Sequence, residues 1–321
     1  MKICIVGPGF MPIPSSGWGA VENLIWDIRN CLVTRGHEVL IVNTTNQNQI
    51  INEVNAWDPD FVHVQYDDYA GVIPHLKTKN VALTSHYGYL TQPHRWDGGY
   101  RNIFNNQLNS GANIFCLSPQ ILKIYESAGY PKEKLFVTPN GADVKSFRFE
   151  ENFNENTTAC LAKVENRKRQ NLTHHVESVK YYGRPAPGFE HVIQNNKNYM
   201  GEITRADLFQ KLTNHANLTL LSDGEAHALV INEAASAGLG IVLSEFAWSN
   251  INPQLPWVTI IPELLMIDKG YIEHAITKNA HTALGMRKQI REYAENYLSW
   301  DFMIDRYYIT YMNSIIERNK F

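Results

Sequence analysis

Residues 218–244, LTLLSDGEAHALVINEAASAGLGIVLS, contain two short apolar runs on either side of an Ala-rich segment. The runs at 218–221 and 240–244 have the length and composition of buried strands. The segment at 226–238 between them is predicted to be a helix. A strand, a helix and a second strand in this order indicate a parallel sheet whose faces are covered by helices.

The same alternation extends over most of the chain. In the first part, strands are predicted at residues 3–6, 39–42, 61–64, 81–84 and 114–117. After a polar, Asn-rich stretch at 150–158, further strands are predicted at 159–163, 191–194 and 258–261. From residue 280 the chain is predicted to be helical, with one break at 299–301. This order indicates an α/β protein of two Rossmann-like, doubly wound lobes facing each other across a cleft.

The composition is that of a folded protein with nearly balanced charge. Of 321 residues, 44% are hydrophobic and 19% are charged, and 29 Lys and Arg stand against 32 Asp and Glu, a net charge of −3. This excludes a disordered chain and disfavours binding of nucleic acid or anionic membranes through overall basic charge. An anionic ligand must therefore be met by a local group of basic residues.

The N-terminus and the cysteines predict the cellular location. The apolar run at 3–6 is broken by GPG at 7–9, so it is too short for a signal peptide, and no run approaches the roughly 18 apolar residues of a membrane span. The four cysteines are scattered without a CxxC pair, so we expect reduced thiols rather than disulfides or a zinc site. These features predict a cytoplasmic protein.

Two glycine-containing segments near the N-terminus are candidates for phosphate binding. GPG at 7–9 follows the first predicted strand, but the prolines at 12 and 14 prevent the immediate helix of a dinucleotide site. Gly17 and Gly19 precede a predicted helix at 21–35, whose free N–H groups favour an anion. An ordinary turn from loop to helix explains the same glycines, so both interpretations stay open.

A basic run follows the first predicted strand of the second lobe. Lys163, Arg167, Lys168 and Arg169 place four cations within seven residues. A diphosphate needs such fixed donors, above all as a leaving phosphate gains charge. A solvated helix start is the alternative explanation.

Glu225 and Glu233 are two acidic residues within or beside the predicted helix at 226–238. If the helix includes both, its rise of about 12 Å separates them too far for the acid pair of a glycosidase. We therefore expect them to act separately along an elongated ligand. Because Glu233 lies among apolar residues, its carboxylate either points to solvent or accepts hydrogen bonds from a hydroxylated ligand.

His86 and a loop rich in aromatic residues follow the predicted strand at 81–84. His86 stands at a carboxyl end, where ligands of doubly wound sheets bind, although a structural role is the alternative. Tyr rings with polar tips in this loop suit sugar rings or nucleobases, unless the loop packs its own aromatic residues. GxSxG, HExxH and GxxxxGK[ST] motifs are absent from the sequence, which removes the usual hydrolase, zinc peptidase and P-loop functions.

Taken together, these segments resemble retaining GT-B glycosyltransferases of family 4 over residues 2–315. The matching segments are GWGAVE at 17–22 with RGHEV at 35–39, DFVHV at 60–64, TSH at 84–86, PNGAD at 139–143, the E-x7-E pair Glu225 and Glu233, and YLSW at 297–300. The resemblance implies a GT-B fold. Its acceptor lobe would span residues 1–150, its shortened donor lobe 151–300, and a helix at about 301–321 would pack back on the first lobe.

The resemblance also implies roles for the matching positions. His86 and Glu225 are expected to be catalytic, close to the transferred sugar. The expected donor-binding residues are Gly17, Gly19, Lys163, Lys168, Glu225, Leu229 and Glu233. The implied reaction moves a sugar from a UDP- or GDP-type donor with retention of configuration, without a cofactor or metal ion. Lys163 stands where the family usually has Arg, Gly240 replaces a proline, and the usual strand with a glycine turn is poorly matched between 181 and 200.

The acceptor is expected to be a saccharide or another hydroxyl compound. Its candidate contacts are Tyr66, Asp67, Tyr87, Tyr89, Arg95 and Trp96. A nucleic acid acceptor is disfavoured but stays open, and so does peripheral contact with a membrane. Two other functions stay open: a donor-binding protein without turnover, and a sugar-nucleotide epimerase of the same fold.

Overall fold

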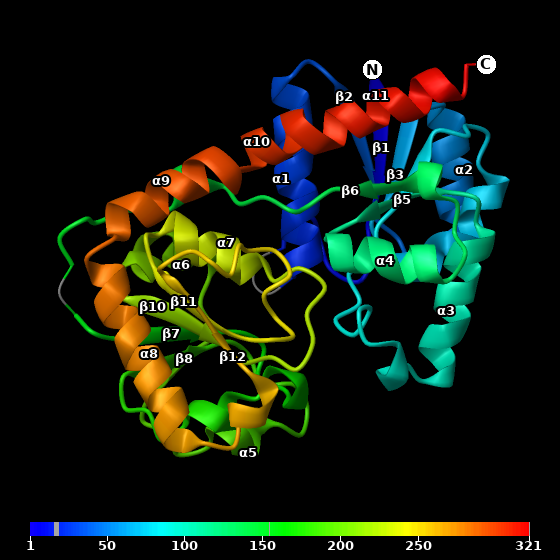
Figure 1. Cartoon of the computed structure of the whole chain (residues 1–321). Coiled ribbons are helices and arrows are strands. Elements are labelled where there is room, and N and C mark those ends of the chain that lie inside the picture. The colour runs from blue at the N-terminus through cyan, green and yellow to red at the C-terminus, as the bar shows by residue number, and fades with distance from the viewer. Residues whose placement is uncertain (16–18, 154, 321) are drawn as a thin grey trace. The chain divides into compact units, whose positions relative to one another are not determined.

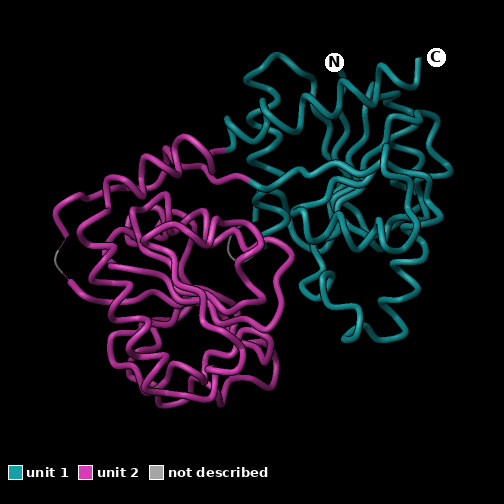
Figure 2. The backbone as a smooth tube through the Cα atoms, viewed as in Figure 1, with its two compact units in different colours: residues 1–15, 19–140, 300–321 teal, residues 16–18, 141–299 magenta. Residues whose placement is uncertain are grey.

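The computed structural model describes residues 1–15, 19–153 and 155–320. The chain divides into two compact units (Figure 2). Unit 1 comprises residues 1–15, 19–140 and the chain from 300 on, and unit 2 comprises residues 141–299. Each unit contains a six-stranded parallel sheet with flanking helices (Figure 1), which confirms the prediction of two Rossmann-like, doubly wound lobes.

The sheet of unit 1 has the strand order β2-β1-β3-β4-β5-β6. Its strands are β1 (Lys2–Val6), β2 (Glu38–Val42), β3 (Phe61–Val64), β4 (Val81–Leu83), β5 (Asn113–Cys116) and β6 (Leu135–Val137). Its helices within residues 1–140 are α1 (Ala20–Thr34), α2 (Gln47–Trp57), α3 (Gly98–Asn109) and α4 (Pro119–Ser127). Ile3 and Ile5 of β1 are fully buried, and so are Cys4 and Val6, because helices cover both faces of a parallel sheet.

The C-terminal segment packs on unit 1. It consists of α10 (Trp300–Met303), a π-helical turn (Ile304–Tyr308) and α11 (Ile309–Arg318). The indole N–H of Trp300 donates to Asp27 at 3.2 Å, and Arg35 forms an ion pair with Asp305 at 2.6 Å. The ring of Tyr308 lies 5.6 Å from that of Phe115, so the segment completes the aromatic core beside β5.

The sheet of unit 2 has the strand order β12-β11-β10-β7-β8-β9. Its strands are β7 (Thr158–Leu161), β8 (Val179–Tyr182), β9 (Tyr199–Gly201), β10 (Asn217–Leu220), β11 (Gly240–Ser244) and β12 (Val258–Ile261). Its helices are α5 (Glu190–Ile193), α6 (Arg205–Lys211), α7 (Leu229–Ser236), α8 (Lys269–Leu284) and α9 (Arg287–Tyr297). Val179, Val242 and Ile276 belong to one buried cluster between the sheet and α8.

Residues 141–150 pack with unit 2, so the division lies ten residues before the boundary expected from the sequence. The backbone N–H of Arg148 donates to the carbonyl of Phe209 at 2.8 Å, and the ring of Phe147 lies 4.8 Å from that of Phe209. The buried guanidinium of Arg287 donates to the carbonyl of Glu150 at 2.7 Å. These contacts fix the segment to unit 2.

The strand expected at 191–194 is wrong: these residues lie in or next to the short helix α5. The strands that the sequence analysis missed there are β8 and β9, and β6 was missed in unit 1. In β8 the buried positions alternate with half-buried Lys180 and Tyr182, so the strand has no continuous apolar run. At Gly240, an added Cβ would lie 2.6 Å from the Cβ of Ala283 in α8, which explains why no proline stands there.

Among the described residues, no helix combines the length and the apolar character needed to cross a membrane. All four cysteines lie in the described part of the chain, and none of them is in a disulfide. Burial raises the pKa of Cys4 and of Cys160 to about 12, so both thiols stay protonated at neutral pH.

Candidate functional site

The sheet of unit 2 brings charged residues together at its carboxyl edge. The strand order reverses between β7 and β10, so the connections after these two strands leave the sheet on opposite sides. Ligands of doubly wound sheets bind at such a reversal. Lys163 follows β7, and Glu225 follows β10.

Glu225 is the centre of an ion cluster at this edge. Its Oε1 accepts a hydrogen bond from Nζ of Lys168 and lies 3.1 Å from Nη1 of Arg167. Arg167 also donates to Glu165 at 2.9 Å, and Nζ of Lys163 lies 3.9 Å from the same carboxylate. The structure therefore links Lys163, Lys168 and Glu225, and it adds Arg167 of the same basic run to the cluster.

The electrostatics of the cluster depend on burial. The side chain of Glu225 is buried, which opposes its ionisation, but the charges of Lys168 and Arg167 outweigh this cost and hold its pKa below the usual value. Glu225 is therefore ionised at neutral pH. The Lys168 side chain is 11% exposed and that of Lys163 is 41% exposed, so Lys163 is the more accessible of the two cations.

The basic run is not a solvated helix start. It forms short 3-10 turns over Asn166–Lys168 and Gln170–Thr173, separated by Arg169 in a left-handed conformation at φ 51°. Arg169 lies 2.8 Å from the carboxylate of Glu263 and 3.6 Å from that of Asp223. It is therefore directed to a different set of acids than Lys168.

Helix α7 carries the second acid of the E-x7-E pair. Glu233 is half-buried in α7, and the half-buried Leu229 is the first residue of that helix. Because α7 begins at Leu229, Glu225 lies in the preceding loop. The expected separation of about 12 Å along one helix therefore does not apply to this pair.

A glycine turn that the sequence analysis missed lies beside Lys163. Gly183 follows β8 at φ 138°, and an added Cβ would lie 2.0 Å from the carbonyl oxygen of Ala162. The backbone N–H of Val164 donates to the carbonyl of Arg184 at 2.9 Å. Only glycine permits this close approach. The signal in the sequence is the Gly-Arg-Pro triplet directly after VKYY at 179–182.

Gly19 lies at the start of α1 in unit 1, while Gly17 lies outside the described residues. Gly19 has φ 140°, and an added Cβ would lie 2.7 Å from Oγ of Ser15 and 3.1 Å from Oε2 of Glu22. Burial raises the pKa of Glu22. The N-cap residue of α1 is Gly19, which has no side chain to cap the helix.

His86 lies just beyond β4 and contacts a residue beyond β3. Its Nε2 lies 2.9 Å from Oε1 of Gln65, which is buried. Val64 and Leu83 are register partners in the sheet, so Gln65 and His86 leave neighbouring strand ends. Burial lowers the pKa of His86 to about 4, and the ring is neutral at pH 7.

Asp67 lies next to this position and is buried. Its Oδ2 accepts hydrogen bonds from Oγ of Ser85 at 2.5 Å and from the hydroxyl of Tyr100 at 3.2 Å. Burial raises the pKa of Asp67 against the effect of these two donors. The ring of Tyr87 stacks on that of Tyr100 with centroids 3.5 Å apart, so Asp67 and Tyr87 belong to one packed group.

The other aromatic candidates have structural partners. The guanidinium of Arg95 lies 4.4 Å above the ring of Tyr89, and Tyr66 packs edge-on against Tyr69 at 5.0 Å. Trp96 is buried, and its indole N–H donates to the carbonyl of Tyr89 at 2.8 Å. Trp96 therefore supports the loop from within. No three His, Cys, Asp or Glu side chains of the described residues converge as a metal site.

Comparisons with known proteins identify the fold and a related family. Residues 43–146, about a third of the chain, match the model of Glycosyltransferase Family 4. No curated protein matches the chain. This match confirms the family resemblance seen in the sequence over those residues. The solved structures described next bear on the fold.

Three solved structures of low sequence identity are similar over nearly the whole chain. AviGT4, a glycosyltransferase involved in avilamycin A biosynthesis, has 16% identity and a TM-score of 0.71, with 98% of each chain covered. HepE from Anabaena in complex with UDP and glucose has 14% identity and a TM-score of 0.73, with 98% of this chain and 99% of HepE covered. Sucrose-phosphate synthase from Thermosynechococcus elongatus has 13% identity and a TM-score of 0.79, with 97% and 98% covered. The fold is therefore GT-B.

Proposed function

We propose that this chain is a cytoplasmic glycosyltransferase that moves a sugar from a nucleoside diphosphate donor to a hydroxyl group, with retention of configuration and without a metal ion. The observation that carries the proposal is the Lys168–Arg167–Glu225 cluster, with Lys163 beside it, at the strand reversal of unit 2. Cations at a ligand edge suit a diphosphate, which needs fixed donors.

In the proposed reaction the bond between the sugar C1 and the diphosphate oxygen breaks, and the acceptor oxygen bonds to C1 on the same face. The acceptor proton passes to the departing phosphate oxygen. Lys163 and Lys168 stabilise the negative charge that develops there. Glu225 and His86 lie by the transferred sugar, Glu233 and Leu229 hold the ribose side, and Gly17 and Gly19 present backbone to the phosphates.

For the acceptor we propose a saccharide or another hydroxyl compound, bound by residues of unit 1. Asp67 with Tyr87 and Tyr89, and at the margin Tyr66 and Arg95, offer aromatic rings with polar groups, which suit sugar rings. UDP is the first nucleotide to test, since the similar HepE was crystallised with UDP and glucose.

The proposal is tested by incubating the protein with UDP-, GDP- and ADP-glucose and a mixture of saccharide acceptors, with products identified by mass spectrometry. We expect transfer with one donor and its loss in Glu225→Ala and His86→Ala. Full turnover in both variants would refute these site assignments. Binding of a donor without product would favour a binding protein, and an isomerised donor would favour an epimerase.

A further inference from the structure

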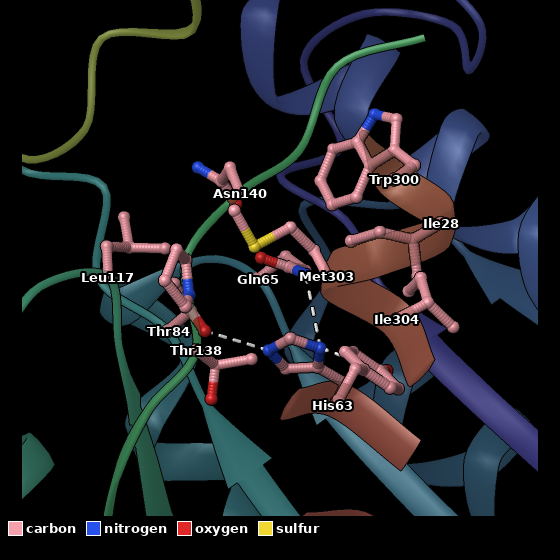
Figure 3. A pocket seen from close by; sticks show the side chains of 12 residues that line it. Ile28, His63, Gln65, Thr84, Leu117, Thr138, Asn140, Trp300, Met303 and Ile304 are labelled. Carbon is pink, nitrogen blue, oxygen red and sulfur yellow. Dashed lines mark hydrogen bonds between the residues drawn. The ribbon is translucent and has the colours of Figure 1, made fainter. Parts of the chain in front are cut away.

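A continuous series of hydrogen bonds connects the core of unit 1 to His86. Figure 3 shows the ring of His63 between Thr84 and Gln65. Nε2 of His63 lies 2.8 Å from Oγ1 of Thr84, and Nδ1 lies 3.1 Å from Nε2 of Gln65. The other end of the Gln65 amide, Oε1, lies 2.9 Å from Nε2 of His86.

The donor and acceptor roles in this series follow from its buried end, at Thr84. The hydroxyl of Thr84 has one proton, which it donates to the backbone carbonyl of Phe115 at 3.2 Å. Its oxygen therefore accepts from Nε2–H of His63. Burial lowers the pKa of His63 to about 3, so the ring carries only this one proton and Nδ1 is an acceptor.

The orientation of Gln65 follows from the acceptor at Nδ1 of His63. The Gln65 amide N–H and the Tyr308 hydroxyl, each at 3.1 Å, share the single lone pair of that nitrogen as donors. The carbonyl end of Gln65 then faces His86 and needs a donor. Because His86 is neutral, its single proton lies on Nε2, and Nδ1 has a lone pair. A reversed amide would set the Gln65 carbonyl oxygen against the lone pair of Nδ1 of His63, so two acceptors would face each other.

We propose that Gln65 and His63 are positioning residues that hold His86 in its Nε2–H tautomer, so that Nδ1 accepts a hydrogen bond from a hydroxyl group of the sugar donor. No described residue is hydrogen-bonded to this nitrogen. The identity of the hydroxyl rests on the proposed function, but the tautomer does not. In this tautomer Nδ1 of His86 accepts a hydrogen bond, and it has no proton to donate to the leaving group.

The tautomer is tested on the protein without substrate, by NMR of 15N-histidine-labelled samples at pH 7. In the wild type we expect the proton of His86 on Nε2, protected from exchange with water. Gln65→Met keeps the side-chain length and removes both hydrogen bonds, so its His86 proton is expected to exchange rapidly. Gln65→Glu keeps an acceptor for Nε2–H and is expected to retain the protected proton.

Gln107→Met is the matched control, because Gln107 is an equally buried glutamine of unit 1 that accepts from Tyr125. It should leave the His86 signals unchanged. A proton on Nδ1 of His86 in the wild type, or a protected Nε2 proton in Gln65→Met, would overturn the inference. Absence of sugar transfer would instead count against the proposed function, since the NMR measurement needs no turnover.

Discussion

Glu225 pairs with two of the cations at the proposed diphosphate site. Lys168 and Arg167 both contact its Oε1, so a nucleotide must compete with the carboxylate for them. We predict that Glu225→Gln binds UDP about tenfold more tightly, about 1.4 kcal/mol, because the amide releases both cations at nearly constant shape. Isothermal titration calorimetry measures this affinity.

The same Glu225→Gln variant is expected to lose at least about tenfold in transfer rate, because the carboxylate beside the sugar is gone. Tighter nucleotide binding with slower transfer separates a site residue from a residue that only supports folding. Weaker UDP binding in this variant would show that the carboxylate does not compete with the ligand.

Lys168→Gln is predicted to have the opposite effect on nucleotide binding. A hydrogen bond to a charged group contributes roughly 1.5–3 kcal/mol, so UDP affinity should fall roughly 10- to 100-fold. Lys197→Gln is the matched control, because Lys197 forms an exposed ion pair with Glu177 at 3.4 Å in the same unit. Equal affinities of the two variants would remove Lys168 from the proposed site.

At the level of elements, the turn after β8 sets the position of the segment that carries Lys163. In Gly183→Ala the new Cβ would lie 2.0 Å from the carbonyl oxygen of Ala162 and overlap it, and the backbone at φ 138° disfavours any side chain. We predict a loss of unfolding free energy clearly above the roughly 1–2 kcal/mol of a left-handed alanine alone, together with weaker UDP binding. Urea unfolding and calorimetry measure the two effects.

Gly188→Ala measures the cost of an alanine at positive φ without a steric overlap of its Cβ. Gly188 also has a positive φ, 85°, but an added Cβ would meet no atom within 4 Å. This variant should lose only the roughly 1–2 kcal/mol of unfolding free energy that the backbone conformation costs an alanine, and its UDP binding should be unchanged. If both variants lose the same stability, the contact with Ala162 does not constrain the turn.

The elements that could be predicted from the sequence are those with continuous apolar runs. β1, β3 and β11 are buried on both faces, and their apolar residues, interrupted in β3 only by His63, identify them. β8 alternates buried and half-buried residues, and β9 has the exposed Met200, so neither has such a run. The short apolar group at 191–194 was predicted as a strand in their place, and it lies in or next to α5.

The sequence located candidate site residues only where they follow a strand whose end could be predicted. Lys163, Glu225 and His86 follow strands whose carboxyl ends could be located, so their positions at sheet edges could be expected. Their partners could not. The contact of Lys168 with Glu225 joins residues 57 positions apart, and that of Gln65 with His86 joins residues 21 apart. Such pairs depend on strand order, which the apolar pattern does not encode.

Considered as a whole molecule, each unit contains a buried histidine that is held neutral. His63 in unit 1 is buried, and its pKa is lowered to about 3. His215 in unit 2 is buried between Thr157 and Tyr182, and burial lowers its pKa to about 4. Neither ring gains a carboxylate partner among the contacts described here, so protonation is unfavourable in both folded units.

This arrangement predicts a stability that depends on pH. Between about pH 4 and 6.5 the unfolded chain binds a proton at each of these histidines that the folded chain does not bind, so stability rises with pH in this window and falls as pH decreases. Each group contributes a slope of about 1.4 kcal/mol per pH unit. We predict that His215→Gln reduces the slope of the unit 2 transition by this amount, measured by urea unfolding at pH 5, 6 and 7. His191→Gln, at an exposed histidine of the same unit, is the control. An unchanged slope in His215→Gln would mean that His215 takes up its proton in the folded state, and that its contacts with Thr157 and Tyr182 do not hold the ring neutral.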